Sequence, residues 1–166
     1  MKGHAEVIDL LNQLLAGELM ARDQYFIHAR MYENWGLTKL FARVWHEMAD
    51  ETEHADWLIR RILFLEGTPA MTPAMTPATP LKIGKKVPEM LKSDLAVEYS
   101  VVKALKQAIA RCEALGDYVT REMLEKMLDD TEEDHAHWLE QQLGLIDMLG
   151  LENYLQAQLG TSPAAS

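Results

Sequence analysis

The chain has 166 residues, of which 26 are acidic and 16 are basic, so its formal net charge is −10. This charge argues against a nucleic-acid backbone or an anionic membrane surface as the main partner, and it is compatible with attracting cations. Apolar residues make up 48% of the chain, enough for a full core in one domain and too many for a disordered acidic tail. The single cysteine, Cys112, excludes an internal disulfide framework, a zinc ribbon and a four-thiolate iron–sulfur site.

The sequence contains no candidate membrane or secretion segment. No stretch of about 18 apolar residues is present. Glu6 and Asp9 interrupt the N-terminal region where a signal peptide would need an apolar core. A single cysteine fits a reducing compartment, so we expect a cytoplasmic protein that does not contact a membrane.

Glycine and proline divide the sequence into four long segments with helical periodicity. We expect helices from about Val7 to Trp35, Leu37 to Glu66, Val87 to Leu115 and Tyr118 to Met148, then a short helix in LENYLQAQL and a loose tail at 161–166. Each long segment carries one apolar stripe with 3-4 spacing, and none alternates with period two.

A proline-rich segment separates the second helix from the third. Residues 68–80, TPAMTPAMTPATP, contain four of the six prolines, each preceded by threonine. Because a residue before proline is driven out of helical geometry, we expect a stiff extended loop, part of a crossover over 67–84. The first two long helices are joined by a short link, and so are the last two, so we expect each pair to form an antiparallel hairpin. The sequence thus predicts an all-α four-helix bundle with one long crossover, the ferritin-like connectivity, in a single domain over residues 1–160.

Each long helix places a carboxylate on its apolar stripe near its middle. These are Glu18, Glu51, Glu98 and Glu132, and two helices add a histidine three residues later, His54 and His135. Four converging carboxylates would repel one another, and the lysines and arginines lie mostly off these stripes. Two divalent cations would balance the charge. One Glu on each of two helices, with Glu-x-x-His on the other two, is the di-iron carboxylate pattern, and these ligand types favour iron or manganese over zinc.

A single Glu-x-x-His motif on a charged helix is weak evidence for a metal site. Several acidic residues and one histidine lie beside the motifs, and we expect most of them on a solvated face: Glu47, Asp50, Glu53, Asp56, Glu133, Asp134 and His137. The specificity lies in the joint pattern, because the stripe carboxylates fall on four separate helices at matching depth.

Several long stretches resemble the bacterioferritin family, and together they cover nearly the whole chain. They are MKGHAEVIDLLNQLLAGEL, DQYFIHARMYENWGL, RRILFLEGTP and GLENYLQAQLG. The resemblance implies a hollow cage of 24 subunits that serves iron storage and detoxification. Each subunit would be a ferroxidase, oxidising Fe(II) to Fe(III) at a di-iron centre inside its bundle, and the ferric mineral would be stored in the cage.

The resemblance also implies roles for particular residues. Glu18 and Glu98 correspond to terminal ligands, Glu51 and Glu132 to bridging ligands, and His54 and His135 to one imidazole for each iron. Tyr25 corresponds to an electron donor near the centre. His46 and Asp50 correspond to an iron-binding pair on the inner surface of the cage, and they share a helix face.

One position departs from the family pattern. The residue after the bridging Glu51 should be the methionine that ligates haem between two subunits, and here it is Thr52. A threonine hydroxyl is a poor axial ligand, so we expect no haem b and place the chain in the haem-free branch. Such a subunit would form the cage alone or co-assemble with a haem-binding bacterioferritin subunit. Iron release needs electrons, which a ferredoxin or a reductase would supply.

Other protein classes share parts of the pattern. Di-iron oxidases acting on organic substrates have the same ligands but need a substrate pocket, usually in a longer chain. A rubrerythrin-like peroxidase usually adds a four-cysteine iron domain, and a DNA-shielding mini-ferritin places its ligands between subunits. A helical scaffold protein would explain one buried glutamate, but not four with two histidines. The sequence leaves open whether oxygen or peroxide is the oxidant and whether the irons are retained or pass inward.

Overall fold

The computed structural model describes residues 2–70 and 81–160, and every regular element in these ranges is a helix. The elements are α1 (Ala5–Asn34), α2 (Thr38–Phe64), α3 (Val87–Ala114), α4 (Tyr118–Asp129), the π-helix η1 (Asp130–Ala136), α5 (His137–Leu149) and α6 (Leu151–Gln158). These bounds lie within about two residues of the expected ones. The tail at 161–166 and most of the proline-rich segment lie outside the described residues.

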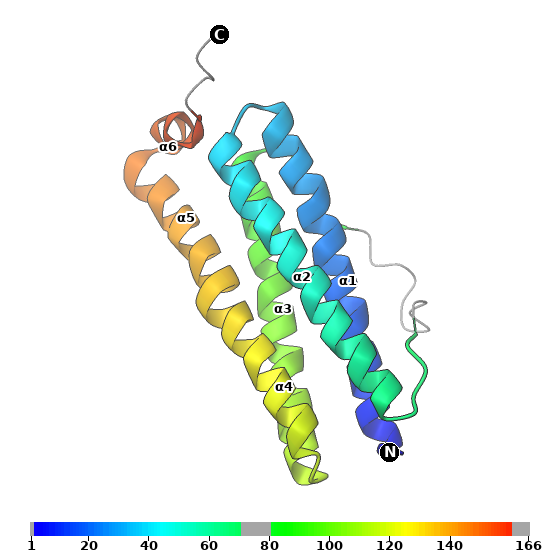
Figure 1. Ribbon diagram of the computed structural model, residues 1–166. Coiled ribbons are helices and arrows are strands. Elements are labelled where there is room, and N and C mark those ends of the chain that lie inside the picture. Colours follow the sequence, from blue (N-terminus) through cyan, green and yellow to red (C-terminus); the bar gives the residue numbers. More distant parts are fainter. Residues whose placement is uncertain (1, 71–80, 161–166) are drawn as a thin grey trace.

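The helices form a bundle of four long rods, in which α4, η1 and α5 together make the fourth (Figure 1). Helices α1 and α2 are antiparallel, and α3 is antiparallel to the fourth rod. Helices α2 and α3 run in the same direction, so the connection between them has to return along the length of the bundle. The expected all-α bundle with one long crossover is confirmed.

The helix pairs are joined by tight glycine turns. Gly36 and Gly116 follow α1 and α3 with φ angles of 76° and 73°, a left-handed conformation that costs glycine little. The next amide in each turn closes a bond to the last helical turn, Leu37 N to Tyr32 O at 2.9 Å and Asp117 N to Cys112 O at 2.9 Å. These turns make each pair of helices antiparallel.

Helix α6 crosses the end of the bundle (Figure 1). The Tyr154 side chain is fully buried, and its hydroxyl donates a hydrogen bond to Gln142 Oε1 at 2.9 Å. The Lys39 ammonium donates to Ala157 O at 2.8 Å, which links α6 to α2. None of the helices in the described ranges combines the length and the apolar character needed to cross a membrane.

The fourth rod departs from the expected stripe in its middle. The sequence predicted a buried face formed by Leu124, Leu128, Glu132, His135 and Leu139. The structure instead buries Leu124, Met127, Thr131, His135 and Leu139. In η1 the hydrogen bonds run from residue i to i+5, which widens the turn and rotates the residues before His135 relative to an α-helix. The expected core position of Glu132 is therefore wrong for this structure, and Thr131 occupies it.

A buried polar network fastens the end of the crossover to the bundle. Gln24 and His28 on α1 both contact Asp94 on α3, with Gln24 Nε2 and His28 Nδ1 each 2.8 Å from Asp94 Oδ1. On the other side, Lys82 N donates to Gln24 Oε1 at 3.1 Å and Gly84 N donates to His28 Nε2 at 3.3 Å. Since Nε2 accepts a hydrogen bond, the Nδ1 atom of His28 is the protonated ring nitrogen, and it donates a hydrogen bond to Asp94.

The junction between α2 and α4 depends on Asp117. Its carboxylate accepts a bond from Thr120 N at 3.1 Å, which caps α4, and another from Arg61 Nη2 at 2.8 Å. We expect Asp117→Ala to lower the free energy of unfolding by about 1–3 kcal/mol, because the cap and the partner of a largely buried guanidinium are both lost. Denaturant unfolding measures this, with Asp9→Ala on the exposed face of α1 as the control. Equal stability of the two variants would contradict this role.

Candidate metal centre

Five of the six predicted ligands meet in the middle of the bundle. They come from all four rods: Glu18 on α1, Glu51 and His54 on α2, Glu98 on α3 and His135 on η1. Each is at most 2% exposed. The stripes of the helices explain this convergence, because each residue continues an apolar face that the fold turns inward.

Glu51 lies between two groups of ligand atoms. One group consists of Glu18, Glu51 and His54, and the other of Glu51, Glu98 and His135. In each group the candidate ligand atoms lie within 4.8 Å of one another. Because a carboxylate has two oxygens, Glu51 can face two cations at once, as the bridging role inferred from the family resemblance requires.

The two histidines have the same orientation toward the centre. The Nδ1 atom of His54 lies 3.5 Å from Glu18 and 3.4 Å from Glu51, with no hydrogen-bond partner. Its Nε2 atom points outward and lies 3.3 Å from Asp130 Oδ2. A carboxylate on the outer nitrogen fixes the tautomer and leaves Nδ1 free for a metal.

His135 repeats this arrangement on the opposite side. Its Nδ1 atom is 3.0 Å from Glu51 Oε1 and 3.8 Å from Glu98 Oε2. Its Nε2 atom faces Glu47 at 3.0 Å and Asp50 at 3.7 Å. The rings of His54 and His135 are stacked with centroids 5.9 Å apart.

The electrostatics of the centre are those of a buried cluster of acids whose only cationic partners among the described residues are the two imidazoles. Burial and the neighbouring Glu51 carboxylate raise the pKa of Glu18 well above its usual range, and burial raises the pKa of Glu98 to about 7. Burial alone would lower the pKa of His54, but its contacts with Glu18 and Glu51 raise it to about 10. The groups around Glu51 thus favour their protonated forms, and divalent cations would displace these protons.

Glu132 is the predicted ligand that the structure does not bring to the centre. Its side chain is 42% exposed and forms an ion pair with Lys106 on α3. The π-helix turns it away, whereas His135 remains inside. A ligand role for Glu132 would require its side chain to turn inward, and it is a proposal.

Tyr25 lies beside the centre, as the resemblance implies. The side chain is 1% exposed, and its hydroxyl donates a hydrogen bond to Glu98 Oε1. Burial and the charge of Glu98 raise its pKa well above the usual tyrosine value. This contact provides a direct link from the phenol to a predicted ligand.

A polar pocket of about 250 Å³ leads from the protein surface to both histidines. Its lining residues are His46, Asp50, Glu53, His54, Trp57, Asp130, Asp134 and His135. His46 Nε2 lies 3.4 Å from Asp50 Oδ2, so the pair predicted to bind iron lies together at this pocket. The pocket gives the centre an access route lined by carboxylates and imidazoles.

Sequence reasoning missed Glu47. We expected the acidic neighbours of the motifs to be mostly solvated, but Glu47 is 1% exposed and contacts both His135 and Arg43. The 3-4 spacing of Val44, Glu47 and Glu51 could have identified it as a residue of the buried face. The run of charges around it concealed this signal.

The donors fit hard or borderline divalent metals. Carboxylate oxygens and imidazole nitrogens suit iron and manganese, and the chain's one thiol, Cys112, is not among these donors. Two divalent cations would also partner three of the buried atoms that lack a hydrogen bond, both oxygens of Glu18 and Oε2 of Glu98. The residues thus fit a pair of iron ions.

Known proteins match this chain over most of its length. The family model described as a ferritin-like domain matches residues 8–149. The chain is 60% identical over 159 residues to a bacterial ferritin of Pseudomonas aeruginosa, covering 96% of this chain and 100% of that protein. A bacterial ferritin of Synechocystis is 58% identical, with 96% and 99% covered. A bacterioferritin of Brucella melitensis is 41% identical over 164 residues, with 99% and 98% covered.

The burial of the Glu18 carboxyl gives a stability prediction. Its raised pKa means that folding forces this group to take up a proton, a cost that Glu18→Gln removes while keeping the shape of the side chain, so the metal-free protein should gain about 1–3 kcal/mol in its free energy of unfolding. With excess Co(II) the order should reverse, because the native protein binds the cation more tightly. Denaturant unfolding with and without Co(II) measures both effects, and Glu33→Gln on the exposed face of the same helix is the control. A metal-free variant less stable than the native protein would contradict the prediction.

Proposed function

Because the chain belongs to the ferritin-like family, we propose that it stores and detoxifies iron by oxidising Fe(II) at the centre formed by Glu18, Glu51, His54, Glu98 and His135. The observation that carries the proposal is the position of Glu51 in both ligand groups. That arrangement suits two metal ions side by side. Relatives at 58–60% identity over 159 residues, named bacterial ferritins, support iron storage as the purpose of the oxidation.

Fe(II) is the substrate of the proposed reaction. The net charge of −10 favours the approach of cations, and the pocket beside His46 and Asp50 offers them a path to the histidines. Glu18 and Glu98 would each hold one iron, with Glu51 between them. Each Fe(II) gives up one electron to oxygen or peroxide, and the ferric product moves inward or stays in place.

The protein's own residues prepare the site for this chemistry. Asp130 and Glu47 hold the outer nitrogens of the two histidines, so that each Nδ1 faces the place where iron would bind. Tyr25 can supply a further electron through its contact with Glu98. Glu132 would complete the ligand set as a second bridge.

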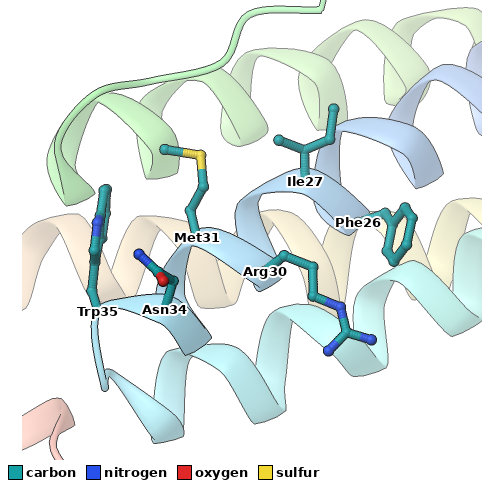
Figure 2. Close-up of a pocket in the computed structure, with 6 residues that line it drawn as sticks. All are labelled: Phe26, Ile27, Arg30, Met31, Asn34 and Trp35. Atoms are coloured by element: carbon teal, nitrogen blue, oxygen red, sulfur yellow. The ribbon is translucent and has the colours of Figure 1, made fainter.

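Assembly into a homo-oligomer, a cage of 24 subunits, is part of the proposal. The outer face of α1 carries an apolar hollow of about 350 Å³ lined by Phe26, Ile27, Arg30, Met31, Asn34 and Trp35 (Figure 2). Phe26 and Trp35 are 46% and 40% exposed in the single chain. Exposed aromatic surface of this kind fits burial between subunits.

Haem is not part of the proposed subunit. Thr52 offers no thioether, and its hydroxyl donates a hydrogen bond to Met48 O at 2.9 Å. Co-assembly with a haem-binding bacterioferritin subunit would supply the missing group, and a ferredoxin or reductase would supply electrons for iron release. The single cysteine supports the cytoplasm as the location.

The central test is a titration of the metal-free particle with Fe(II) in the absence of oxygen. We expect saturation near two irons per subunit, fast oxidation when oxygen is admitted, and a retained mineral at higher loading. Glu51→Gln should slow the oxidation by more than about 100-fold. Loss of a residue that only hydrogen-bonds to a metal ligand already costs about 10- to 100-fold, and Glu51 would itself be a ligand of both irons.

The exposed Asp56→Asn, which lies on the same helix and outside the pocket lining, is the control, and the absorbance of the ferric product follows the reaction. Two bound irons with no retained mineral would indicate a di-iron oxidase of another substrate. Undiminished oxidation in Glu51→Gln would refute the assigned centre.

The role of Tyr25 has its own test. Tyr25→Phe should leave the Fe(II) stoichiometry unchanged and slow the oxidation, and the tyrosyl radical signal that we expect in electron paramagnetic resonance after oxygen is admitted should disappear. Tyr32→Phe is the matched control, since Tyr32 is equally buried on the same helix and lacks a hydrogen-bond partner for its hydroxyl. A radical signal that survives in Tyr25→Phe and disappears in Tyr32→Phe would reverse the assignment.

A further inference from the structure

The backbone of η1 controls which side chains of the fourth rod reach the centre. In an α-helix, residues i and i+3 share a face, so Glu132 and His135 would point inward together. In the π-helix the turn is wider, and the two side chains diverge. His135 is buried against Glu51, whereas Glu132 points outward.

The centre lacks the charge that Glu132 carries. Three carboxylates, Glu18, Glu51 and Glu98, face the interior, and two divalent cations would need a fourth to reach neutrality. The Oε2 atom of Glu98 has no hydrogen-bond partner, although it lies in the group that contains His135. This is the side of the centre from which the fourth rod would present Glu132.

Outside the centre, Glu132 has a single competing partner among the described residues. Lys106 lies two turns beyond Glu98 on α3, and its ammonium pairs with Glu132 Oε1. Both side chains are about half exposed, 55% for Lys106 and 42% for Glu132, so the ion pair is weak enough to be exchanged. A bound pair of cations offers Glu132 a stronger attraction.

Other contacts stabilise the π-helical arrangement of η1, in which Glu132 points outward. The Thr131 hydroxyl donates to Met127 O at 2.7 Å, a side-chain bond to the backbone that competes with regular helical bonding. Asp130, which precedes it, faces Nε2 of His54 at 3.3 Å. Thr131 is therefore buried where the α-helical stripe would place Glu132.

We infer that η1 is a register switch and that Lys106 is its latch: Lys106 holds Glu132 outside the metal-free centre, and divalent cations draw Glu132 inward as Asp130–Ala136 returns to α-helical bonding. The inference rests on the proposed function, because it needs cations at Glu51. Lys106 is a positioning residue, since it acts through Glu132 and does not touch the metal. It sets how tightly the centre takes up its cations.

The test uses Co(II), which binds such donors and has a visible spectrum, on the assembled metal-free protein. Lys106→Gln should bind Co(II) about two- to five-fold more tightly than the native protein, the range expected for release of an exposed ion pair. Lys103→Gln, an exposed lysine one turn earlier on α3, removes the same charge and should leave the affinity near the native value. In a Glu132→Gln background the effect of Lys106→Gln should vanish.

A crystal structure of the Co(II)-loaded protein supplies the second readout, with Glu132 at the metals and α-helical bonding through Asp130–Ala136 as the expected result. Co(II) binding that depends on Glu51 but not on Lys106, or a loaded structure that retains the Lys106–Glu132 pair, would overturn the latch alone. Binding that Glu51→Gln leaves unchanged would overturn the di-metal centre and the latch with it.

Discussion

Three carboxylates closed off from solvent at the middle of the bundle, Glu18, Glu51 and Glu98, impose the main constraint on this molecule. A buried carboxylate needs a proton, a cation or several donors, and here the nearest donors are two imidazoles. The long rods around them supply the stability that tolerates this concentration of charge, because most of their remaining inward positions are apolar. The fold and the chemistry are thus coupled through one layer of the core.

The two halves of the centre are not equivalent. His54 is held from outside by Asp130, which is half exposed at the access pocket, whereas His135 is held by Glu47, which is buried. The buried Glu47 is in turn paired with Arg43. Outer partners of different exposure give otherwise similar imidazoles different basicity, so the two metal positions differ in their surroundings.

Much of the fold and of the candidate metal centre could be predicted from the sequence, because helices of nearly 30 residues carry a strong periodic signal. The same periodicity placed Glu18, Glu51, His54, Glu98 and His135 on inward faces. It failed at Glu132, since stripe counting assumes one helical pitch throughout and a π-helix changes the pitch within a single turn. Thr131 gave no warning, because a small polar residue fits a core edge as well as a surface.

Buried polar contacts between distant segments could not be predicted from the sequence either. Asp94 lies four residues before Glu98 and was not among the predicted site residues, yet it is 1% exposed, and Gln24 and His28 from α1 contact it. Periodicity describes one helix at a time and cannot pair residues 66 or 70 positions apart. Glu47 differs, because its own helix carried the 3-4 spacing that marks a buried position, and only its contact with His135 on another rod needed the structure.

The anchoring of Lys82 and Gly84 by Gln24 and His28 has a consequence for how such chains vary. Asp94 on α3 and the backbone amides of Lys82 and Gly84 just before the helix all contact Gln24 and His28, so α3 is fixed against α1 one turn before Glu98. Lengthening a loop adds only slowly to its closure entropy. The crossover is therefore a place where related chains can gain or lose residues, including threonine–proline repeats, while the distances inside the centre stay the same.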